Sequence, residues 1–491
     1  MQTAGAPGAP HAEEPPARTA TIAFGIAVVA VCAAGAVRGG AAAQLAALTA
    51  LVFLTLVVGH RRLFAWRYLL ATMILVILLI PIRRYELPGS LPFKLEPYRL
   101  LLALLAVGWV FSLLADRRTR LRSSFLDVPI VLVPLVALLS ICVNTSRLTN
   151  ALVSEQVWKT VMFLFSFVVF YFILTSVLRG LDEVDYVLKV LVGGGAIVAL
   201  FAVIEARTEF NVFNHLQGFV PGLSFVGTDA GDLARQGKTR VLGSSQHPIA
   251  LSAALIMLIP VAFYLAHATR RKVWWVAGGI LLMAALATLS RTGVMMLLVV
   301  VLVFAWLRPS IVKRLLPLAL PLLVAVHFVL PGTIGSFKEL FFPEGGLIAE
   351  QAQGQVGSSR GASFRPGLKI VNAQPILGQG YATRITDSED ANAFIVDDEW
   401  LGTAMETGLV GVALWAWIFV RSIRRFGRTA KADGGDGGLL LVSLAAAVGA
   451  FAVGMATYDA FSFIQVTFLL FTLLALGSVA VRSIENAPRL A

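Results

Sequence analysis

The 491-residue sequence is poor in charge and in cysteine, and it lacks the common motifs of nucleotide and metal chemistry. Only 14% of its residues are charged, where about 25% is usual for a soluble protein. Its two cysteines, Cys32 and Cys142, lie in long apolar stretches, which excludes a disulfide framework, a thiolate metal site and cysteine redox chemistry. No P-loop, HExxH or G-x-S-x-G pattern occurs, and no cytosolic domain is large enough for ATP or a nucleotide sugar. If the protein is an enzyme, we therefore expect its donor substrate to be membrane-borne already.

Apolar residues make up 58% of the chain and come in blocks of about 17 to 22, the length of helix that crosses a hydrocarbon core of about 30 Å. No water satisfies the backbone inside a bilayer, so helix is the expected conformation of each block. The pattern predicts an all-α fold, a polytopic transmembrane helical bundle of about fourteen spans. The predicted spans are 18–37, 41–59, 67–82, 98–115, 127–143, 158–178, 187–206, 247–267, 273–290, 292–307, 312–330, 400–420, 438–456 and 460–481.

These spans divide the chain into a tail, three groups of helices and two long loops. Residues 1–17 are rich in Ala, Pro, Gly and Glu and lack the basic start of a cleavable signal, so they are predicted to form a disordered cytoplasmic tail. Long connections without apolar spans are usually functional or disordered. The predicted helix groups are 18–206, 247–330 and 400–491, and the predicted extracytoplasmic loops are 207–246 and 331–399.

The net charge of +12 is distributed along the loops. With the N-terminus in the cytoplasm, every even-numbered loop is basic, as the positive-inside rule requires. We therefore interpret the charge as an orientation signal, with both termini cytoplasmic, and expect no nucleic acid partner. One predicted outer loop departs from the rule, since Arg83–Arg99 carries four basic residues. Either a span is misplaced there or that loop is functional.

Four arginines on the predicted outer face are candidates for binding an anion. Arg291 lies in a short turn between two predicted spans, where an ionisable residue is a functional candidate by default, although it could also snorkel to the interface. Arg240 precedes Gly-Ser-Ser and His247 at the start of a predicted helix, whose N–H groups favour an anion; a solvated loop arginine is the alternative. His247 is a further candidate for substrate binding, although by itself it is better explained as a helix-start residue than as a catalyst. Arg360 and Arg365 lie in the large outer loop.

Together these arginines suit a pyrophosphate, because a planar guanidinium binds phosphate oxygens bidentately. The alternative is attraction of anionic lipid headgroups. Three acids, Asp397, Asp398 and Glu399, stand directly before a predicted span. They either cap that helix and complement its dipole, or one of them acts as a general base.

Four local patterns resemble the O-antigen ligase and polymerase superfamily of bacterial envelope glycosyltransferases. "RVLGSSQHP" at Arg240–Pro248 resembles the family's Arg-x-x-Gly stretch before a span, and "LSRTG" at Leu289–Gly293 resembles its Ser-Arg-x-Gly/Ala turn. The segment Ser359–Tyr381 resembles an Arg-led amphipathic stretch that leads to Pro-Leu-x-Gly-x-Gly. "VDDEWLGTAMETGLVG" at Val396–Gly411 resembles His-Asn-x-Tyr-Leu…Glu-x-Gly-x-x-Gly. The resemblance covers roughly residues 235–420, and the first two hundred residues match only in being helical.

The resemblance implies a glycosyltransferase in the cytoplasmic membrane that needs neither a metal nor a nucleotide cofactor. Such an enzyme moves a glycan from a polyprenyl pyrophosphate to a hydroxyl of a lipid or cell-wall acceptor at the outer face. By position, Arg240, Arg291 and Arg360 would hold the pyrophosphate, with Arg365 as a weaker fourth member. Where ligases of the family have His before Asn, this chain has Asp397 and then Asp398. Asp397, or next Asp398, is therefore expected to accept the proton of the acceptor hydroxyl.

Several alternatives stay open. The acid in place of the family histidine also fits a different acceptor, a repeat-unit polymerase or an inactive member. A transporter or flippase is the rival from another class, but transporters usually have two related halves with a site at mid-membrane. This chain concentrates its unusual residues beside two long loops on one face, which favours the enzyme. A non-catalytic envelope scaffold is the third possibility. Glu406, inside a predicted span, is expected to orient a loop or an arginine.

Overall fold

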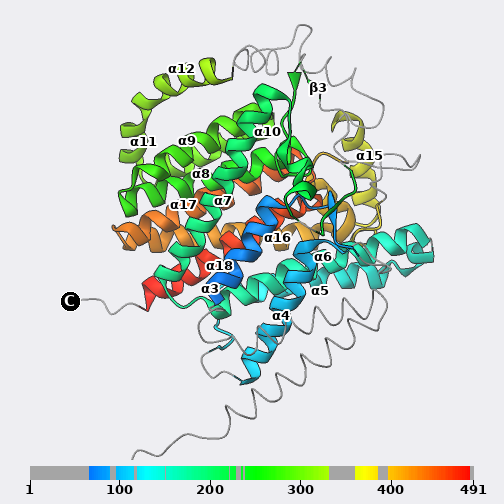
Figure 1. The fold of residues 1–491 in the computed structure, drawn as a ribbon. Coiled ribbons are helices and arrows are strands. Elements are labelled where there is room, and N and C mark those ends of the chain that lie inside the picture. The colour runs from blue at the N-terminus through cyan, green and yellow to red at the C-terminus, as the bar shows by residue number, and fades with distance from the viewer. Residues whose placement is uncertain are drawn as a thin grey trace, which may run out of the picture. The chain divides into compact units, whose positions relative to one another are not determined.

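The structure, a computed structural model, describes most of the chain after its first two predicted spans (Figure 1). The described residues are 66–88, 95–115, 119–149, 151–220, 222–227, 234–235, 238–330, 360–384 and 396–486. The predicted tail, the first two predicted spans with Cys32, and residues 331–359 and 385–395 of the large loop lie outside them. The chain divides into two compact units, 1–68 with 88–94 and 69–87 with 95–491. Every contact discussed below lies within the second unit.

Except at 312–330, each predicted span from the third onward coincides with a described α-helix. Seven of them are long and apolar enough to cross a membrane, and four more are shorter apolar helices. The seven are α4 (Pro97–Ala115), α6 (Ala151–Val177), α7 (Leu181–Thr208), α8 (Pro248–Thr269), α16 (Glu399–Ala432), α17 (Asp436–Gly454) and α18 (Ile464–Glu485). The shorter four are α3 (Trp66–Leu79), α5 (Asp127–Val143), α9 (Lys272–Ala287) and α10 (Arg291–Leu307). The helical architecture is that of a membrane protein, and the total of fourteen spans stays a prediction.

One predicted span, 312–330, is divided into three short elements. They are α11 (Pro309–Leu315), a 3-10 turn η4 (Leu316–Leu318) and α12 (Ala319–Val329). Pro317 lies in the turn, and a proline inside a helix both removes an N–H donor and clashes with the carbonyl four residues earlier. The helix is therefore interrupted where the apolar pattern alone predicts continuity.

The predicted loop 207–246 contains short elements within its described part. These are η2 (Val212–Asn214), η3 (Leu216–Gly218) and the strands β2 (Ser224–Phe225), β3 (Ala234–Arg235) and β4 (Lys238–Thr239). Strand β3 pairs with β4 in an antiparallel hairpin, and β2 pairs with β1 (Tyr85–Glu86). The β1–β2 pairing ties this loop to the predicted outer loop that begins at Arg83.

Several contacts join loops or helix ends that the charge pattern places on the same side of the membrane. The β1–β2 pairing joins two predicted outer loops. On the predicted cytoplasmic side, Arg308 donates to the carbonyls of Ala430 and Asp433, both at 3.0 Å. Arg482 likewise donates to the carbonyl of Leu178 at 3.0 Å. These contacts agree with helices that alternate in direction along the chain.

Helices α17 and α18 form the core against which the others pack. α17 contacts α8, α10, α16 and α18, and α18 contacts α6, α7, α8 and α16 as well. Every residue of α18 from Ile464 to Val481 is buried. The ring of Phe468 packs edge-on against Phe167 and Phe170 of α6. Protein therefore surrounds α18 on all sides along this length.

Helix α16 is broken at Gly408, where the backbone leaves the helical region (φ 69°, ψ −168°). The segment 375–380, which follows α15 (Arg360–Ala373), fills the break. Leu409 N–H donates to the Pro375 carbonyl at 2.8 Å, and Gln379 N–H donates to the Met405 carbonyl at 2.8 Å. Irregular backbone at membrane depth is tolerated when protein satisfies its polar groups, as this segment does here.

Candidate functional site

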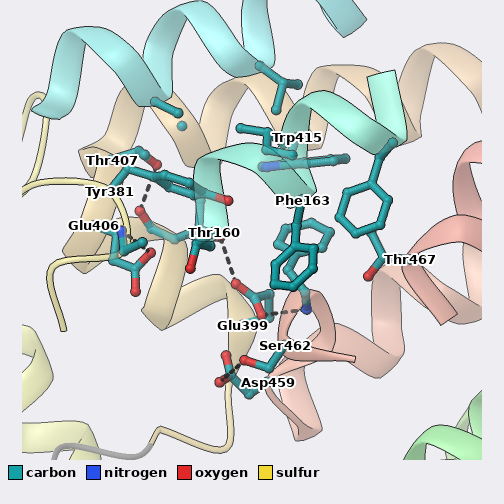
Figure 2. A pocket seen from close by; sticks show the side chains of 18 of the residues that line it. Thr160, Phe163, Tyr381, Glu399, Glu406, Thr407, Trp415, Asp459, Ser462 and Thr467 are labelled. Atoms are coloured by element: carbon teal, nitrogen blue, oxygen red, sulfur yellow. Dashed lines mark hydrogen bonds between the residues drawn. The ribbon is translucent and has the colours of Figure 1, made fainter. Parts of the chain in front are cut away.

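A cavity of about 660 Å³ lies among α5, α6, α16, α18 and the segments around residues 83, 381–384 and 459–462 (Figure 2). Three cationic and three acidic side chains line it, with an apolar wall formed by residues farther along the helices. The ionisable residues are Arg83, Lys159, Arg384, Glu399, Glu406 and Asp459. The apolar wall includes Val133, Phe163, Phe167, Leu414, Trp415 and Phe471. The cavity is therefore amphiphilic, with its charged groups near the helix ends on the predicted outer side.

Arg384 is the most deeply buried cation of the cavity, with 6% of its surface exposed. Its Nε lies 3.2 Å from Glu406 Oε1, and its Nη2 lies 3.5 Å from Asp459 Oδ1. Burial alone would lower the pKa of this guanidinium, but the carboxylates of Asp459 and Glu406 raise it above its ordinary value. Its Nη1 is buried and has no hydrogen-bond partner among the described residues. Arg384 therefore places a fixed positive charge in the wall of the cavity.

Glu406 connects the broken helix to the segment that carries Arg384. One carboxylate oxygen pairs with the guanidinium, and the other accepts a hydrogen bond from Ala382 N–H at 3.1 Å. The expectation that Glu406 orients a loop and an arginine is confirmed. Nearby, burial and then the Glu406 carboxylate raise the pKa of the Tyr381 hydroxyl above its ordinary value, so it keeps its proton.

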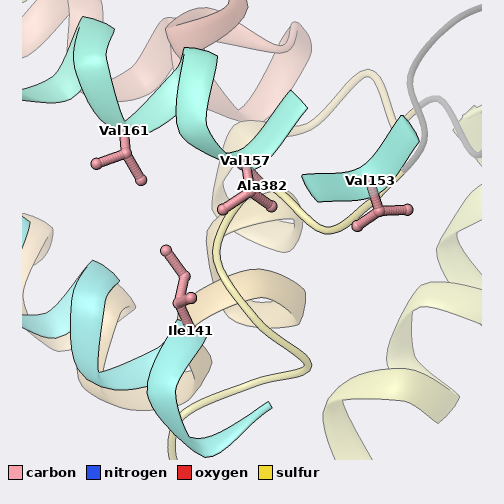
Figure 3. Packing of buried hydrophobic residues seen from close by; sticks show 5 residues of the cluster. All are labelled: Ile141, Val153, Val157, Val161 and Ala382. Carbon is pink, nitrogen blue, oxygen red and sulfur yellow. The ribbon is translucent and has the colours of Figure 1, made fainter. Parts of the chain in front are cut away.

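The segment 377–384 is anchored on α5 and α6. Ala382 packs in an apolar cluster with Val157 of α6 and Ile141 of α5, together with Val153 and Val161 (Figure 3).

Polar contacts reinforce that anchoring. Ser140 Oγ lies 2.7 Å from the Leu377 carbonyl and 2.6 Å from the Glu406 carbonyl, and Asn144 Nδ2 donates to the Gly378 carbonyl at 3.1 Å. Apolar packing and polar contacts together hold the backbone that presents Arg384.

The three acids before α16 have different environments. Asp398 caps the helix, because its Oδ1 accepts from Leu401 N–H at 3.1 Å, so the capping interpretation is confirmed for this residue. Glu399 is buried and turns into the cavity, where its Oε2 accepts from Phe461 N–H at 2.9 Å. Asp397 is half-buried and is not among the residues that line the cavity. Within the described part of the chain, no group of three His, Cys, Asp or Glu side chains is arranged to hold a metal ion.

Arg240 and Arg291 come from two motifs that the fold brings together. Arg240 is buried, and its Nε donates to the Thr288 carbonyl at 3.0 Å, three residues before Arg291. Ser290 Oγ caps α10 by accepting from Gly293 N–H. Arg291 is the first residue of this helix and directly follows the short turn that the sequence predicts. Neither arginine lines the cavity.

The turn between α9 and α10 adjoins one of the cavity segments. Thr292, next to Arg291, lies within hydrogen-bonding distance of Thr457, with 2.8 Å between the two hydroxyl oxygens. Asp459, two residues farther along, lines the cavity. The turn that carries Arg291 therefore contacts the segment that leads to Asp459 in the cavity wall.

His247 is a helix-start residue, as the alternative interpretation held. Its Nδ1 accepts from Ile249 N–H at 3.2 Å, and its ring stacks on Phe463 with 5.7 Å between centroids. Arg365 is exposed on α15. Arg360 is the first residue of that helix, and its side chain lies outside the description. The structure thus brings Arg240 and Arg291 together and leaves the contribution of α15 as a prediction.

The segment that carries Arg240 is held by a buried carboxylate and a buried guanidinium. Glu205, near the end of α7, accepts from Leu242 N–H at 3.0 Å and from Gly243 N–H at 2.9 Å. Arg84 donates to the carbonyls of Gly243 (3.1 Å) and Ser245. Gly243 itself has a φ of +52°, which lets the chain turn between these two partners. In the basic outer loop Arg83–Arg99, Arg84 therefore positions the segment that carries Arg240, and its neighbour Arg83 lines the cavity.

We expect Glu205→Ala to destabilise the protein by about 1–3 kcal/mol, because two buried N–H groups would lose their acceptor. The melting temperature in detergent measures this effect. Glu155→Ala, an exposed carboxylate on α6, is the matched control and should melt like the wild type. Equal melting temperatures for the two variants would contradict the role assigned to Glu205.

Sequence comparison identifies a family for part of the chain. Residues 276–416 match the family model described as O-antigen ligase. The matched stretch includes Arg291. It also includes Arg384, Glu399 and Glu406, which are three of the six charged residues that line the cavity. Among curated proteins, none matches the chain significantly. The family match confirms the resemblance inferred from the motifs.

Proposed function

Because the match over residues 276–416 supports membership in the O-antigen ligase family, we propose that this chain is a membrane glycosyltransferase. In this proposal a glycan passes from a polyprenyl diphosphate carrier to a hydroxyl acceptor at the outer face of the cytoplasmic membrane. The observation that carries the proposal is the amphiphilic cavity. A polyprenyl diphosphate is itself amphiphilic, with an anionic diphosphate beside an apolar chain. The charged groups of the cavity suit the first part and its apolar wall suits the second.

The diphosphate would lie against Arg83, Lys159 and Arg384. Arg83 and Lys159 are exposed side chains at the cavity, and Arg384 adds the buried Nη1 donor. Because two carboxylates already fix the guanidinium of Arg384, little reorganisation is needed when the leaving group develops charge. Preorganised donors of this kind are usually the largest contribution to transition-state stabilisation.

Arg240, Arg291 and Arg360 form a second set of cations, to which the family resemblance assigns the diphosphate. The turn that carries Arg291 contacts the segment before Asp459 through Thr292 and Thr457. The two sets make different predictions, because the first set lines the cavity, whereas Arg240 and Arg291 do not. Arg291→Ala and the double variant Arg83→Ala/Lys159→Ala separate them.

We expect the double variant Arg83→Ala/Lys159→Ala to bind the lipid-diphosphate donor at least tenfold more weakly, since each hydrogen bond between charged groups contributes about 1.5–3 kcal/mol. The measurement is transfer of glycan from a polyprenyl diphosphate donor by purified protein in detergent, as a function of donor concentration. Arg147→Ala is the control, because Arg147 is an exposed arginine of a predicted outer loop that does not line the cavity. Unchanged donor affinity in the double variant, with a large loss in Arg291→Ala, would assign the diphosphate to the second set.

A further inference from the structure

Three carboxylates line the cavity, and two of them are occupied by structural partners. Glu406 uses one oxygen for Arg384 and the other for Ala382 N–H. Asp459 uses Oδ1 for Arg384 and Oδ2 for the Ser462 hydroxyl at 2.6 Å. Both oxygens of Glu406 and of Asp459 are therefore already engaged by protein donors.

Glu399 has a different environment. Its Oε2 accepts from Phe461 N–H at 2.9 Å, its Oε1 lies 3.5 Å from the Thr403 hydroxyl, and its carboxyl group also interacts with the side chain of Asp459. Among the described residues, no Lys, Arg or His nitrogen forms an ion pair with Glu399 within 4.0 Å. Figure 2 shows its carboxylate inside the cavity, beside Asp459 and Ser462. Oε1 is therefore the carboxylate oxygen best placed to receive a proton from a ligand.

A second observation is an unpartnered buried donor close to Glu399. The Nη1 of Arg384 is buried without a partner in the described residues, although the residue is only 6% exposed and lines the same cavity. Buried donors are nearly always hydrogen-bonded, so an unmatched one signals a missing partner. The guanidinium lies close to Glu399, since a Cβ placed at Gly402 would lie 3.2 Å from Arg384 Nη2 and 3.7 Å from Glu399 Oε1. Arg384 and Glu399 therefore lie close together in the wall of one cavity.

We propose that Glu399 is the catalytic residue that accepts the proton of the incoming hydroxyl. This inference rests on the proposed glycan transfer. In the step, the acceptor O–H bond breaks and its proton goes to Glu399 Oε1, while the acceptor oxygen forms a bond to the anomeric carbon of the glycan. The bond from that carbon to the diphosphate oxygen breaks, and its electron pair leaves with the polyprenyl diphosphate. Arg384, Arg83 and Lys159 stabilise the charge of the leaving group.

The assignment moves the base two positions from the one that the motif pattern implies. Asp397 takes the place of the family histidine in the alignment of motifs, but it does not line the cavity. Asp398 is engaged as the helix cap. Glu399 is the first residue of α16, and the helix directs its side chain inward.

The test compares Glu399→Gln with Asp397→Asn and Asp398→Asn in the purified full-length protein. Glutamine keeps the size of the side chain and its acceptor for Phe461 N–H, so the fold is preserved, which the melting temperature checks. Glycan transfer from a polyprenyl diphosphate donor to a hydroxyl acceptor gives kcat and the KM for the donor. We expect Glu399→Gln to lower kcat by about 10²–10⁴-fold with little change in the donor KM, the range typical of losing a general base. The two aspartate variants should keep kcat within a few-fold of the wild type, about 1 kcal/mol in the barrier.

Three results from the variants would overturn this role. Wild-type kcat in Glu399→Gln excludes it, and a large loss of kcat in Asp397→Asn alone returns the role to Asp397. A Glu399→Gln variant that loses donor affinity and kcat in parallel would show a positioning residue instead. A wild-type protein that neither binds nor turns over the polyprenyl diphosphate donor overturns the proposed function, and the catalytic role of Glu399 falls with it.

Discussion

Gly408→Ala is expected to prevent the protein from accumulating in a folded form. The backbone at Gly408 has φ 69° and ψ −168°, a region that is essentially restricted to glycine and strains other residues by about 1–3 kcal/mol. Strain is the smaller part of the effect. A Cβ at this position would overlap the carbonyl of Ile376, which belongs to the segment that fills the break in α16.

The overlap cannot be relieved locally, because the contact is between two backbones. Moving Ile376 away would break the hydrogen bonds from Leu409 and Val410 to the segment 375–380. The same segment leads to Arg384, so the cavity would lose its buried cation as well.

The amount of monodisperse protein in detergent and its melting temperature measure the effect. Gly279→Ala is the matched control, since a Cβ at Gly279 in α9 meets nothing within 4 Å. Alanine is favoured over glycine in a helix by about 1 kcal/mol, so this control should melt at or above the wild-type temperature. A Gly408→Ala variant as stable as the wild type would show that the break in α16 is not required.

The positions of the helices follow from the sequence because each one is set by its own residues. A block such as 127–143 is apolar over the length of a span, and it coincides with α5. The break in α16 cannot be predicted in this way. "METGLVG" contains Gly408, but the groups that satisfy the broken backbone come from residues 375–380, and apolar periodicity holds no information about that pairing.

The candidate site is predictable only in part, because some of its residues come together from distant parts of the chain. The motif arginines Arg240 and Arg291 can be identified from their local context, and the structure places them in contacting segments. The cavity joins residues from distant parts of the chain, such as Arg384 and Asp459, which are 75 positions apart. Lys159 is different, because it lies inside a predicted span, where an ionisable residue is a functional candidate by default. That rule identifies Arg291 and applies equally to Lys159.

Arg384→Met is expected to destabilise the protein by about 3–5 kcal/mol, the usual effect of removing one partner from a buried ion pair. The side chains of Arg384, Glu406 and Asp459 are 5%, 14% and 15% exposed, so solvent compensates little for the lost charge. Methionine retains most of the volume, and the loss therefore reports on charge and hydrogen bonding. The melting temperature in detergent is the measurement.

Stability and function can then be separated by removing the carboxylates as well. In Arg384→Met/Glu406→Gln/Asp459→Asn no unpaired charge is left behind, and buried ion pairs are often replaced by neutral groups at little loss of stability. We expect this triple variant to recover much of the melting temperature. It should still fail to transfer glycan, because the fixed positive charge of Arg384 in the cavity wall is absent. Recovery of both properties would show that Arg384 only supports the fold, and the diphosphate would then have to be held by the other cations alone.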